Sequence, residues 1–291
     1  MTAGAFCRSR RGHLVVTGCA LYVGIMRTPM SLFKRGPRVA VVPLSGMIAA
    51  SGRSAALNDA GVAPLLEKAF RRGKPSAVAL IINSPGGSPV QSSLIGARIR
   101  RLAEETKIPV IAFVEDVAAS GGYWIASAAD EIIVDPGSVV GSIGVISASF
   151  GAHELLARQG IERRVYTAGK SKSMLDPFRP ENEEDVARLR VILEELHVVF
   201  KDHIQARRGA KLPEDRDLFT GEIWIGQSAV AVGLADAVGH VVPVMKDRFG
   251  EKVRFMRYGI RRGLLQRFGA SILGDALSQV EERALYARFG L

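Results

Sequence analysis

Ser120 and Lys172 are the two residues whose types and surroundings point most directly to chemistry. Ser120 lies in residues 117–124 (VAASGGYW), between an apolar stretch and a glycine-rich turn, where a serine is placed to act as a nucleophile. Lys172 follows 52 residues later, in residues 169–178 (GKSKSMLDPF). An amine that apolar neighbours keep neutral takes up the proton of a serine hydroxyl. The pair therefore predicts a serine–lysine hydrolase.

Ser120 also has a simpler interpretation, because a serine in front of a helix often only caps that helix. Two features favour the nucleophile. A predicted strand over residues 109–114 would deliver Ser120 to a sheet edge, and the glycines after it would let a substrate backbone approach closely. The free N–H groups at a helix start also stabilise an oxyanion.

A second glycine-rich turn, residues 83–88 (NSPGGS), follows another predicted strand. Consecutive N–H groups exposed after a strand would form the second half of an oxyanion hole. The Gly-Lys-Ser/Thr ending of a phosphate-binding loop is missing here, and a tight strand-to-helix turn is the plainer alternative.

The identity of the base has competing candidates. Lys170 lies two positions from Lys172, and periodicity does not separate them. A Ser-His-Asp triad is disfavoured because Ala118 stands where the Gly-x-Ser-x-Gly motif has its first glycine. No histidine lies in a motif paired with a serine; the five are His13, His153, His197, His203 and His240. Ser142, in residues 141–145 (GSIGV), would either hold the lysine amine in line or form only a turn.

The rest of the pattern alternates short apolar strands with amphipathic helices, which indicates one α/β domain with a mainly parallel sheet. Residues 76–82 form a continuous apolar run, as a strand buried on both faces requires. The predicted strands cover residues 39–44, 76–82, 109–114, 131–134 and 163–167. Helices are expected after Asn58, Ser88, Ser120 and Asn182 and near residues 153–158.

The net charge of +10 is concentrated at the two ends of the chain. Residues 1–38 carry +7 and residues 252–291 carry +5, which leaves −2 for the part between them. This distribution suits an anionic membrane surface better than a nucleic-acid partner. Both cysteines, Cys7 and Cys19, precede the globular part, so neither a disulfide framework nor a cysteine metal site is expected within it.

Together these motifs resemble the signal peptide peptidase A (protease IV) family of serine–lysine peptidases, in its short single-repeat form. The resemblance spans roughly residues 39–244; its motifs are residues 83–87, 118–124, 141–145, 169–178 and 233–236. It implies a Clp-protease/crotonase-like α/β fold with a mainly parallel sheet.

The resemblance also assigns roles to individual residues. It implies that Ser120 is the nucleophile and that Lys172, in preference to Lys170, is the base. Ser142 would position the lysine. The oxyanion would be bound by the N–H groups of Gly86 or Gly87 and of Gly121.

The resemblance further implies the setting in which this site works. The substrates would be cleaved signal peptides, other membrane-associated peptides or unfolded segments, hydrolysed without a cofactor or a metal. The chain would form a homo-oligomeric ring, associated with the bacterial inner membrane, in which neighbouring subunits complete each site. This chain departs from the family at Ser171, where an aromatic residue is frequent, and in lacking a clear membrane anchor, so a cytoplasmic location is the alternative. An acyl-CoA hydratase/isomerase on the same fold and a non-catalytic membrane scaffold are the alternative functions.

We expect three regions along the chain. Residues 1–37 form a basic extension whose apolar run, residues 14–26, has the length of a signal-peptide core; it is either an anchor or the result of a start placed too early. Residues 38–251 form the peptidase domain. Residues 252–291 form a basic amphipathic helical tail that either packs on protein or makes a peripheral contact with an anionic membrane.

Overall fold

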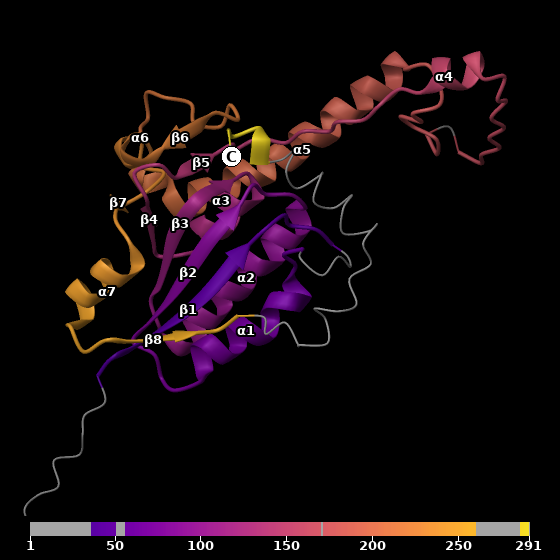
Figure 1. The fold of residues 1–291 in the computed structure, drawn as a ribbon. Helices are drawn as coiled ribbons and strands as arrows, with labels where there is room; N and C mark the ends of the chain where they lie inside the picture. Colours follow the sequence, from indigo (N-terminus) through magenta and orange to yellow (C-terminus); the bar gives the residue numbers. More distant parts are fainter. Residues whose placement is uncertain (1–35, 51–55, 170, 260–285, 291) are drawn as a thin grey trace, which may run out of the picture. The chain divides into compact units, whose positions relative to one another are not determined.

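The computed structural model describes residues 36–50, 56–169, 171–259 and 286–290. Within these ranges an eight-stranded sheet is flanked by helices (Figure 1). The strands are β1 (Arg38–Ser45), β2 (Ala77–Ser84), β3 (Val110–Ala119), β4 (Glu131–Val134), β5 (Val139–Gly141), β6 (Ile223–Ile225), β7 (Ala237–Val238) and β8 (Arg254–Arg257). The helices are α1 (Asp59–Arg71), α2 (Pro89–Thr106), α3 (Gly121–Ser127), α4 (His153–Arg158), α5 (Glu183–Arg208), the 3₁₀ turn η1 (Gly209–Lys211), α6 (Gly226–Ala231) and α7 (Val241–Phe249).

The strand order β6-β5-β3-β2-β1-β8 places the apolar strands β2 and β3 in the interior of the sheet, with β4 pairing with β3 and β7. Every pairing is parallel except that of β5 with β6. This confirms the predicted α/β fold with a mainly parallel sheet. The carboxyl ends of neighbouring parallel strands meet at one edge, which is where open α/β sheets place their ligands.

Two layers of side chains cover the sheet. On one face α1, α2, α3 and the last turns of α5 form the larger core, which includes Leu66, Ile95, Tyr123 and Ile204. On the other face α7 contributes Met245 to a smaller core. Strand β2 is buried along nearly its whole length, as its continuous apolar sequence predicted.

Asparagine side chains cap the starts of α1 and α5, as the sequence predicted. Asn58 Oδ1 accepts a hydrogen bond of 2.8 Å from the Gly61 N–H at the start of α1. Asn182 Oδ1 accepts one of 2.9 Å from the Glu184 N–H at the start of α5. Each cap satisfies an N–H group that has no partner within its helix.

Several expectations differ from the structure or lie outside it. The predicted strand over residues 163–167 is wrong: this stretch is mostly exposed and has no neighbouring strand, so its apolar residues lack a sheet to join. Strand β3 runs five residues beyond the predicted end at 114. Strand β8 pairs with β1, so the sheet continues into the range that we assigned to the tail. The extension 1–35 and the tail over 260–285 lie outside the described residues.

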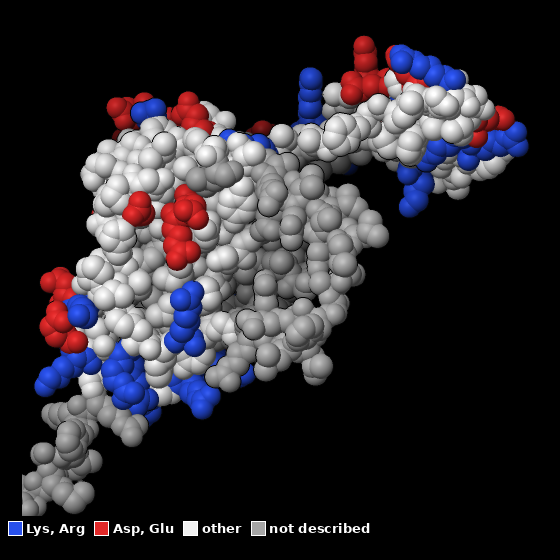
Figure 2. All heavy atoms as spheres, in the orientation of Figure 1, with Lys and Arg blue, Asp and Glu red and all other residues white. Residues whose placement is uncertain are grey.

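Charged side chains are unevenly distributed on the body (Figure 2). Lys and Arg side chains gather where β1 begins and α1 ends, and the exposed ones include Arg71, Arg72, Lys74 and Arg254. This is the amino-terminal end of the parallel strands, opposite the end at which β3 leads into Ser120.

Candidate active site

Ser120 lies between the end of β3 and the start of α3, in a backbone conformation that a serine rarely adopts. Its φ is +52° and its ψ is −120°. Such a conformation costs about 1–3 kcal/mol and persists only where the surrounding structure holds it in place. Here the Ser120 N–H donates to the Gly141 carbonyl at 2.9 Å, and the Ser120 carbonyl accepts from the Trp124 N–H at 3.0 Å.

The Ser120 hydroxyl does not cap α3. It makes no capping hydrogen bond at the helix start, and the side chain is half-buried at the edge of the sheet. The simpler interpretation of this serine, an N-cap, therefore does not describe the structure. A strained backbone that presents an uncapped hydroxyl is the arrangement expected for a nucleophile.

Gly86 lies against the backbone around Ser120. Its φ is +103°, and a Cβ atom at this position would lie 2.8 Å from the Ala119 oxygen and 2.9 Å from both the Gly121 nitrogen and the Ser120 Cβ. Only glycine fits such a close approach. The two glycine-rich turns that the sequence singled out therefore meet at Ser120.

The hydrogen bonds of this turn separate Gly86 from Gly87 as oxyanion donors. The Gly86 N–H already donates to Ser84 Oγ at 3.3 Å. Ile48 bonds to the Gly86 carbonyl and to the Ser88 N–H, both at 2.8 Å, in a parallel bridge centred on Gly87. In such a bridge the N–H of the central residue points away from the partner. The Gly87 N–H, which is on an exposed residue, is thus better placed than that of Gly86 to act with the first N–H of α3, on Gly121.

Ser142 lies beside Ser120 because of the strand register. Ala119 at the end of β3 pairs with Gly141 at the end of β5, so the next residue on each strand is a serine. Ser142 also has a positive φ of +50°, and its N–H donates to the Glu222 carbonyl at 2.7 Å. The structure therefore brings Ser120, Ser142, Gly86, Gly87 and Gly121 together.

Lys172 is not part of this cluster within a single chain. It lies on the segment 144–182, which we call the lysine segment, and its side chain is exposed. No hydrogen bond joins Lys172 to Ser120 or Ser142, all three of which the structure describes. Lys170, the competing base, lies outside the described residues.

The lysine segment is held together mainly by its own contacts. Asp176 accepts from the Phe178 N–H at 3.0 Å and from Arg163, whose guanidinium lies 4.9 Å from the centre of the Phe178 ring. These hydrogen bonds, first from the Phe178 backbone and then from Arg163, lower the pKa of the Asp176 carboxyl. The segment contains α4, none of whose residues is buried.

His203 is a residue whose placement the sequence did not reveal. It belongs to α5, and its ring stacks on the Trp124 ring of α3 with the centroids 4.2 Å apart. Its Nε2 lies 2.9 Å from Ser127 Oγ. Burial lowers the pKa of His203 to about 4. The spacing of Phe200, His203 and Arg207 would have indicated one shared helix face, but not that this face covers the helix that follows Ser120.

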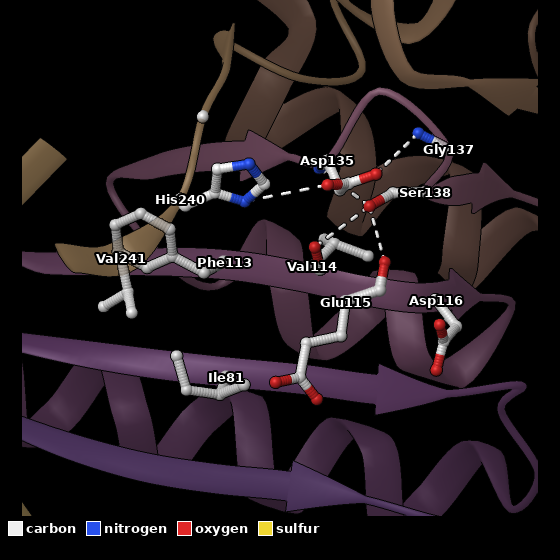
Figure 3. A pocket seen from close by; sticks show the side chains of 11 residues that line it. Ile81, Phe113, Val114, Glu115, Asp116, Asp135, Gly137, Ser138, His240 and Val241 are labelled. Carbon is white, nitrogen blue, oxygen red and sulfur yellow. Dashed lines mark hydrogen bonds and ion pairs between the residues drawn. The ribbon is translucent and has the colours of Figure 1, made fainter. Parts of the chain in front are cut away.

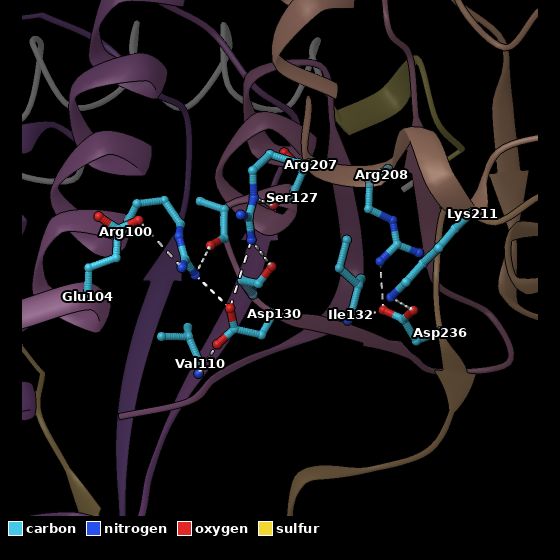
Figure 4. A network of polar contacts seen from close by, with 12 residues as sticks. Arg100, Glu104, Val110, Ser127, Asp130, Ile132, Arg207, Arg208, Lys211 and Asp236 are labelled. Atoms are coloured by element: carbon cyan, nitrogen blue, oxygen red, sulfur yellow. Dashed lines mark hydrogen bonds and ion pairs between the residues drawn. The ribbon is translucent and has the colours of Figure 1, made fainter. Parts of the chain in front are cut away.

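Polar contacts surround the end of α5 (Figure 4). The buried Arg208 donates to the Gly233 carbonyl at 3.1 Å and to Asp236 at 2.7 Å, and Asp236 also accepts from the Ile132 N–H at 2.7 Å. Burial favours the neutral form of Asp236, but the hydrogen bonds from Arg208 and Lys211 outweigh it and lower its pKa. The motif at residues 233–236 therefore anchors α5 to β4.

A separate pocket of about 530 Å³ lies on the α7 face of the sheet (Figure 3). Its lining includes Glu115, Asp116 and Asp135. The Asp135 carboxylate lies 3.6 Å from His240 Nδ1. None of the predicted site residues lines this pocket. We therefore do not include it in the candidate active site.

In the part of the chain that the structure describes, no three His, Cys, Asp or Glu residues are grouped so that they could hold a metal ion. None of the helices in this part combines the length and the apolar character needed to cross a membrane.

Comparisons with known proteins agree with a peptidase. The model of peptidase family S49 matches residues 103–248. The chain is 33% identical over 224 residues to the chloroplastic serine protease SPPA of Arabidopsis thaliana, covering 75% of this chain and 33% of that protein. It is 49% identical over 271 residues to a protein of Brucella melitensis named Na(+)/H(+) antiporter NhaA, covering 87% of this chain and 37% of that one. The chain thus spans about a third of the length of these relatives.

A solved structure also overlaps with most of the chain. It is that of a lysine-to-alanine mutant of the 1510-N membrane-bound stomatin-specific protease in complex with a substrate peptide. The two chains are 13% identical with a TM-score of 0.45, and the alignment covers 84% of this chain and 99% of that one.

Proposed function

The chain belongs to peptidase family S49, and we propose that it is a serine endopeptidase in which Ser120 is the nucleophile and Lys172 the base. The observation that carries this assignment is the Ser120 geometry: a strained backbone, an uncapped hydroxyl and direct contact with Gly86. A serine with only a structural role has no need of this combination.

The surroundings of Ser120 supply the steps of peptide hydrolysis. The Lys172 amine takes the hydroxyl proton as Ser120 Oγ attacks the peptide carbonyl carbon. The N–H groups of Gly87 and Gly121 donate to the carbonyl oxygen as it becomes negative. The proton passes to the leaving amine when the C–N bond breaks, which leaves an acyl-enzyme. Water, deprotonated by the same lysine, then releases the second product and restores the serine.

A second copy of the chain supplies the lysine in this proposal. Within one chain Lys172 is exposed and makes no hydrogen bond to Ser120 or Ser142. The lysine segment also exposes large apolar side chains: Phe150 is 91% exposed and Tyr166 is 90% exposed. Apolar groups of this size are stabilised by burial against another protein surface. We therefore place Lys172 of one subunit beside Ser120 and Ser142 of its neighbour in a homo-oligomeric ring.

The proposed substrates are cleaved signal peptides, other membrane-associated peptides or unfolded segments, and the proposed location is the bacterial inner membrane, with the cytoplasm as the alternative. The resemblance of the motifs to the family supports both the proposed substrates and the proposed membrane location. The acyl-CoA hydratase/isomerase alternative would use the oxyanion hole without the serine. The scaffold alternative would use neither the serine nor the lysine.

Single variants and their mixtures test the proposal. We expect Ser120→Ala and Lys172→Ala each to lose peptide hydrolysis by at least about 1,000-fold, because the members of such a dyad act as a unit. Lys170→Ala, the matched control, should keep most of its activity. Subunits of Ser120→Ala and Lys172→Ala that are unfolded and refolded together should regain activity, because some neighbouring pairs then contain one intact serine and one intact lysine.

Each contrary result points to a different error. Wild-type cleavage by Ser120→Ala would exclude this serine as the nucleophile. Loss in Lys170→Ala with retention in Lys172→Ala would move the base to Lys170. No recovery on mixing, with both variants still assembling, would place serine and lysine in the same chain. Acyl-CoA turnover that survives Ser120→Ala would favour the hydratase/isomerase.

A further inference from the structure

We propose that His203 is a positioning residue that fixes α5 against α3 and thereby sets where Lys172 meets Ser120 of the neighbouring subunit. The inference rests on the proposed function and adds to it a residue outside the dyad and the oxyanion hole. Helix α3 begins directly after the nucleophile, and α5 begins directly after the lysine segment. His203 lies where these two helices touch.

His203 contacts α3 in two ways. Its ring lies 4.2 Å from the Trp124 ring at an interplanar angle of 7°. Its Nε2 lies 2.9 Å from Ser127 Oγ and 3.3 Å from the Trp124 carbonyl oxygen. The Ser127 hydroxyl already donates its hydrogen to the Trp124 carbonyl at 2.8 Å.

These partners favour one tautomer. The Trp124 carbonyl oxygen only accepts, so a hydrogen bond from His203 to it requires the proton on Nε2. In this tautomer the neutral imidazole donates to oxygens of α3 while its face covers Trp124. Burial lowers the pKa of His203 to about 4, which keeps the ring neutral near pH 7.

Among the described residues, the contacts of α5 with the body are concentrated in its second half, where His197 Nε2 lies 3.3 Å from the Ile143 carbonyl oxygen. The residues of α5 that are buried are Phe200, Ile204 and Arg208. Next to them Arg207 donates to the Ser127 carbonyl at 3.0 Å and to the Ala129 carbonyl at 2.9 Å (Figure 4). Farther towards the start of the helix, Val191, Leu196, Val198 and Val199 are exposed. The lysine segment is therefore joined to a helix that is fixed mainly at its far end.

The length of the helix makes this contact matter for catalysis. At 1.5 Å per residue, Glu183 lies about 30 Å from His203 along α5. A tilt of about 2° at His203 would then displace the start of the helix by about 1 Å, and a displacement of that size can reduce catalysis about 100-fold. A single ring contact would not prevent such tilts of α5. The stack on Trp124 and the hydrogen bonds to Ser127 together restrict α5 in two directions.

A cross-link between subunits measures this positioning directly. Ser120→Cys and Lys172→Cys are combined in the full chain, with Cys7 and Cys19 replaced by serine. A bis-maleimide with a spacer about as long as a lysine side chain is added, and the rate of cross-linking between subunits is followed, because the Cα atoms of a lysine and a serine in contact are too far apart for a direct disulfide. His203→Ala and His203→Phe are compared in this background with Asp202→Ala, an exposed neighbour on the same helix. Activity is measured in the same three variants with Ser120 and Lys172 intact.

At temperatures well below the melting temperature of the variant, we expect His203→Ala to lower both the cross-linking rate and kcat at least about tenfold. Its KM should stay within about twofold of the parent value. His203→Phe keeps a ring over Trp124 but loses the donated hydrogen bonds; it should fold and show an intermediate effect. Asp202→Ala should match the parent in both measurements.

The outcomes separate this inference from the proposed function. If the His203 variants cross-link and turn over like Asp202→Ala while only their melting temperatures fall, His203 has a purely structural role and the inference is wrong. If the cysteine pair fails to cross-link even with His203 present, the pairing of Lys172 with a neighbouring Ser120 is wrong, and the inference falls with it.

Discussion

At the scale of single residues, the space around Gly86 is the sharpest constraint. Gly86→Ala would place a methyl group 2.8–2.9 Å from Ala119, Ser120 and Gly121, at a φ of +103°. The turn must shift, and with it the proposed oxyanion donors, so we expect kcat for peptide hydrolysis to fall about 100-fold or more. Gly160→Ala is the control, because Gly160 also has a positive φ but nothing within 4 Å. Equal activity of the two variants would contradict the oxyanion assignment.

His203 makes stability depend on pH in a predictable direction. Its pKa is about 4 in the folded chain because of burial, against about 6.5 when unfolded. The unfolded chain therefore binds the extra proton first, and the free energy of unfolding should fall by ~3 kcal/mol between pH 6.5 and pH 4 and level off below. Urea unfolding of wild type and His203→Phe at several pH values isolates this contribution from that of the carboxylates. If the free energy of unfolding depends on pH in the same way in the two proteins, His203 does not make this contribution.

At the scale of elements, the ion pair at the end of α5 joins parts that are distant in the sequence. Arg208 and Asp236 have side chains only 2% and 16% exposed, and Asp236 also accepts from the β4 backbone. Asp236→Ala would leave Arg208 buried without its partner, so we expect a loss of about 3–5 kcal/mol in urea unfolding. Glu131→Ala breaks the half-exposed pair with Arg248 and should cost at most about 1 kcal/mol. Similar losses in the two variants would show that the buried pair does not anchor α5.

At the scale of the whole molecule, the basic tail bears on where the protein works. Its last described residues pack on the sheet: Tyr286 and Phe289 contact Val117, Ala119 and Val139. Between them and β8 lie Arg261, Arg262 and Arg267, outside the described residues. We expect the full chain to co-sediment with anionic vesicles but not with neutral ones, because each basic residue near such a surface contributes about 1 kcal/mol.

The control for this prediction changes charge only. Replacing Arg261, Arg262 and Arg267 by glutamine should weaken co-sedimentation, and added salt should weaken it in the wild type because salt screens surface charges. If the wild type stays in the supernatant with every vesicle composition, the tail packs on protein alone.

The sequence by itself determined the layers of the fold and the residue types of the site. Strand β2 could be predicted because a strand buried on both faces is apolar throughout. The starts of α1 and α5 could be predicted because asparagine caps act locally. The end of β3 was missed because the charged residues Glu115 and Asp116 interrupt the apolar pattern at the point where the register with β2 shifts. The local sequence pattern does not predict a register shift between two strands.

Only the tertiary structure decided which of the candidate residues meet. The register of β3 with β5 places Ser142 beside Ser120, and the bridge of Gly87 to Ile48 favours Gly87 over Gly86 as a donor. The stack of His203 on Trp124 joins residues 79 positions apart. Contacts of this kind depend on how separate elements pack, and residue spacing along the chain carries no record of that packing. The exposure of Lys172 within its own chain is likewise a property of the folded subunit, and it directs the search for the catalytic base to the neighbouring copy.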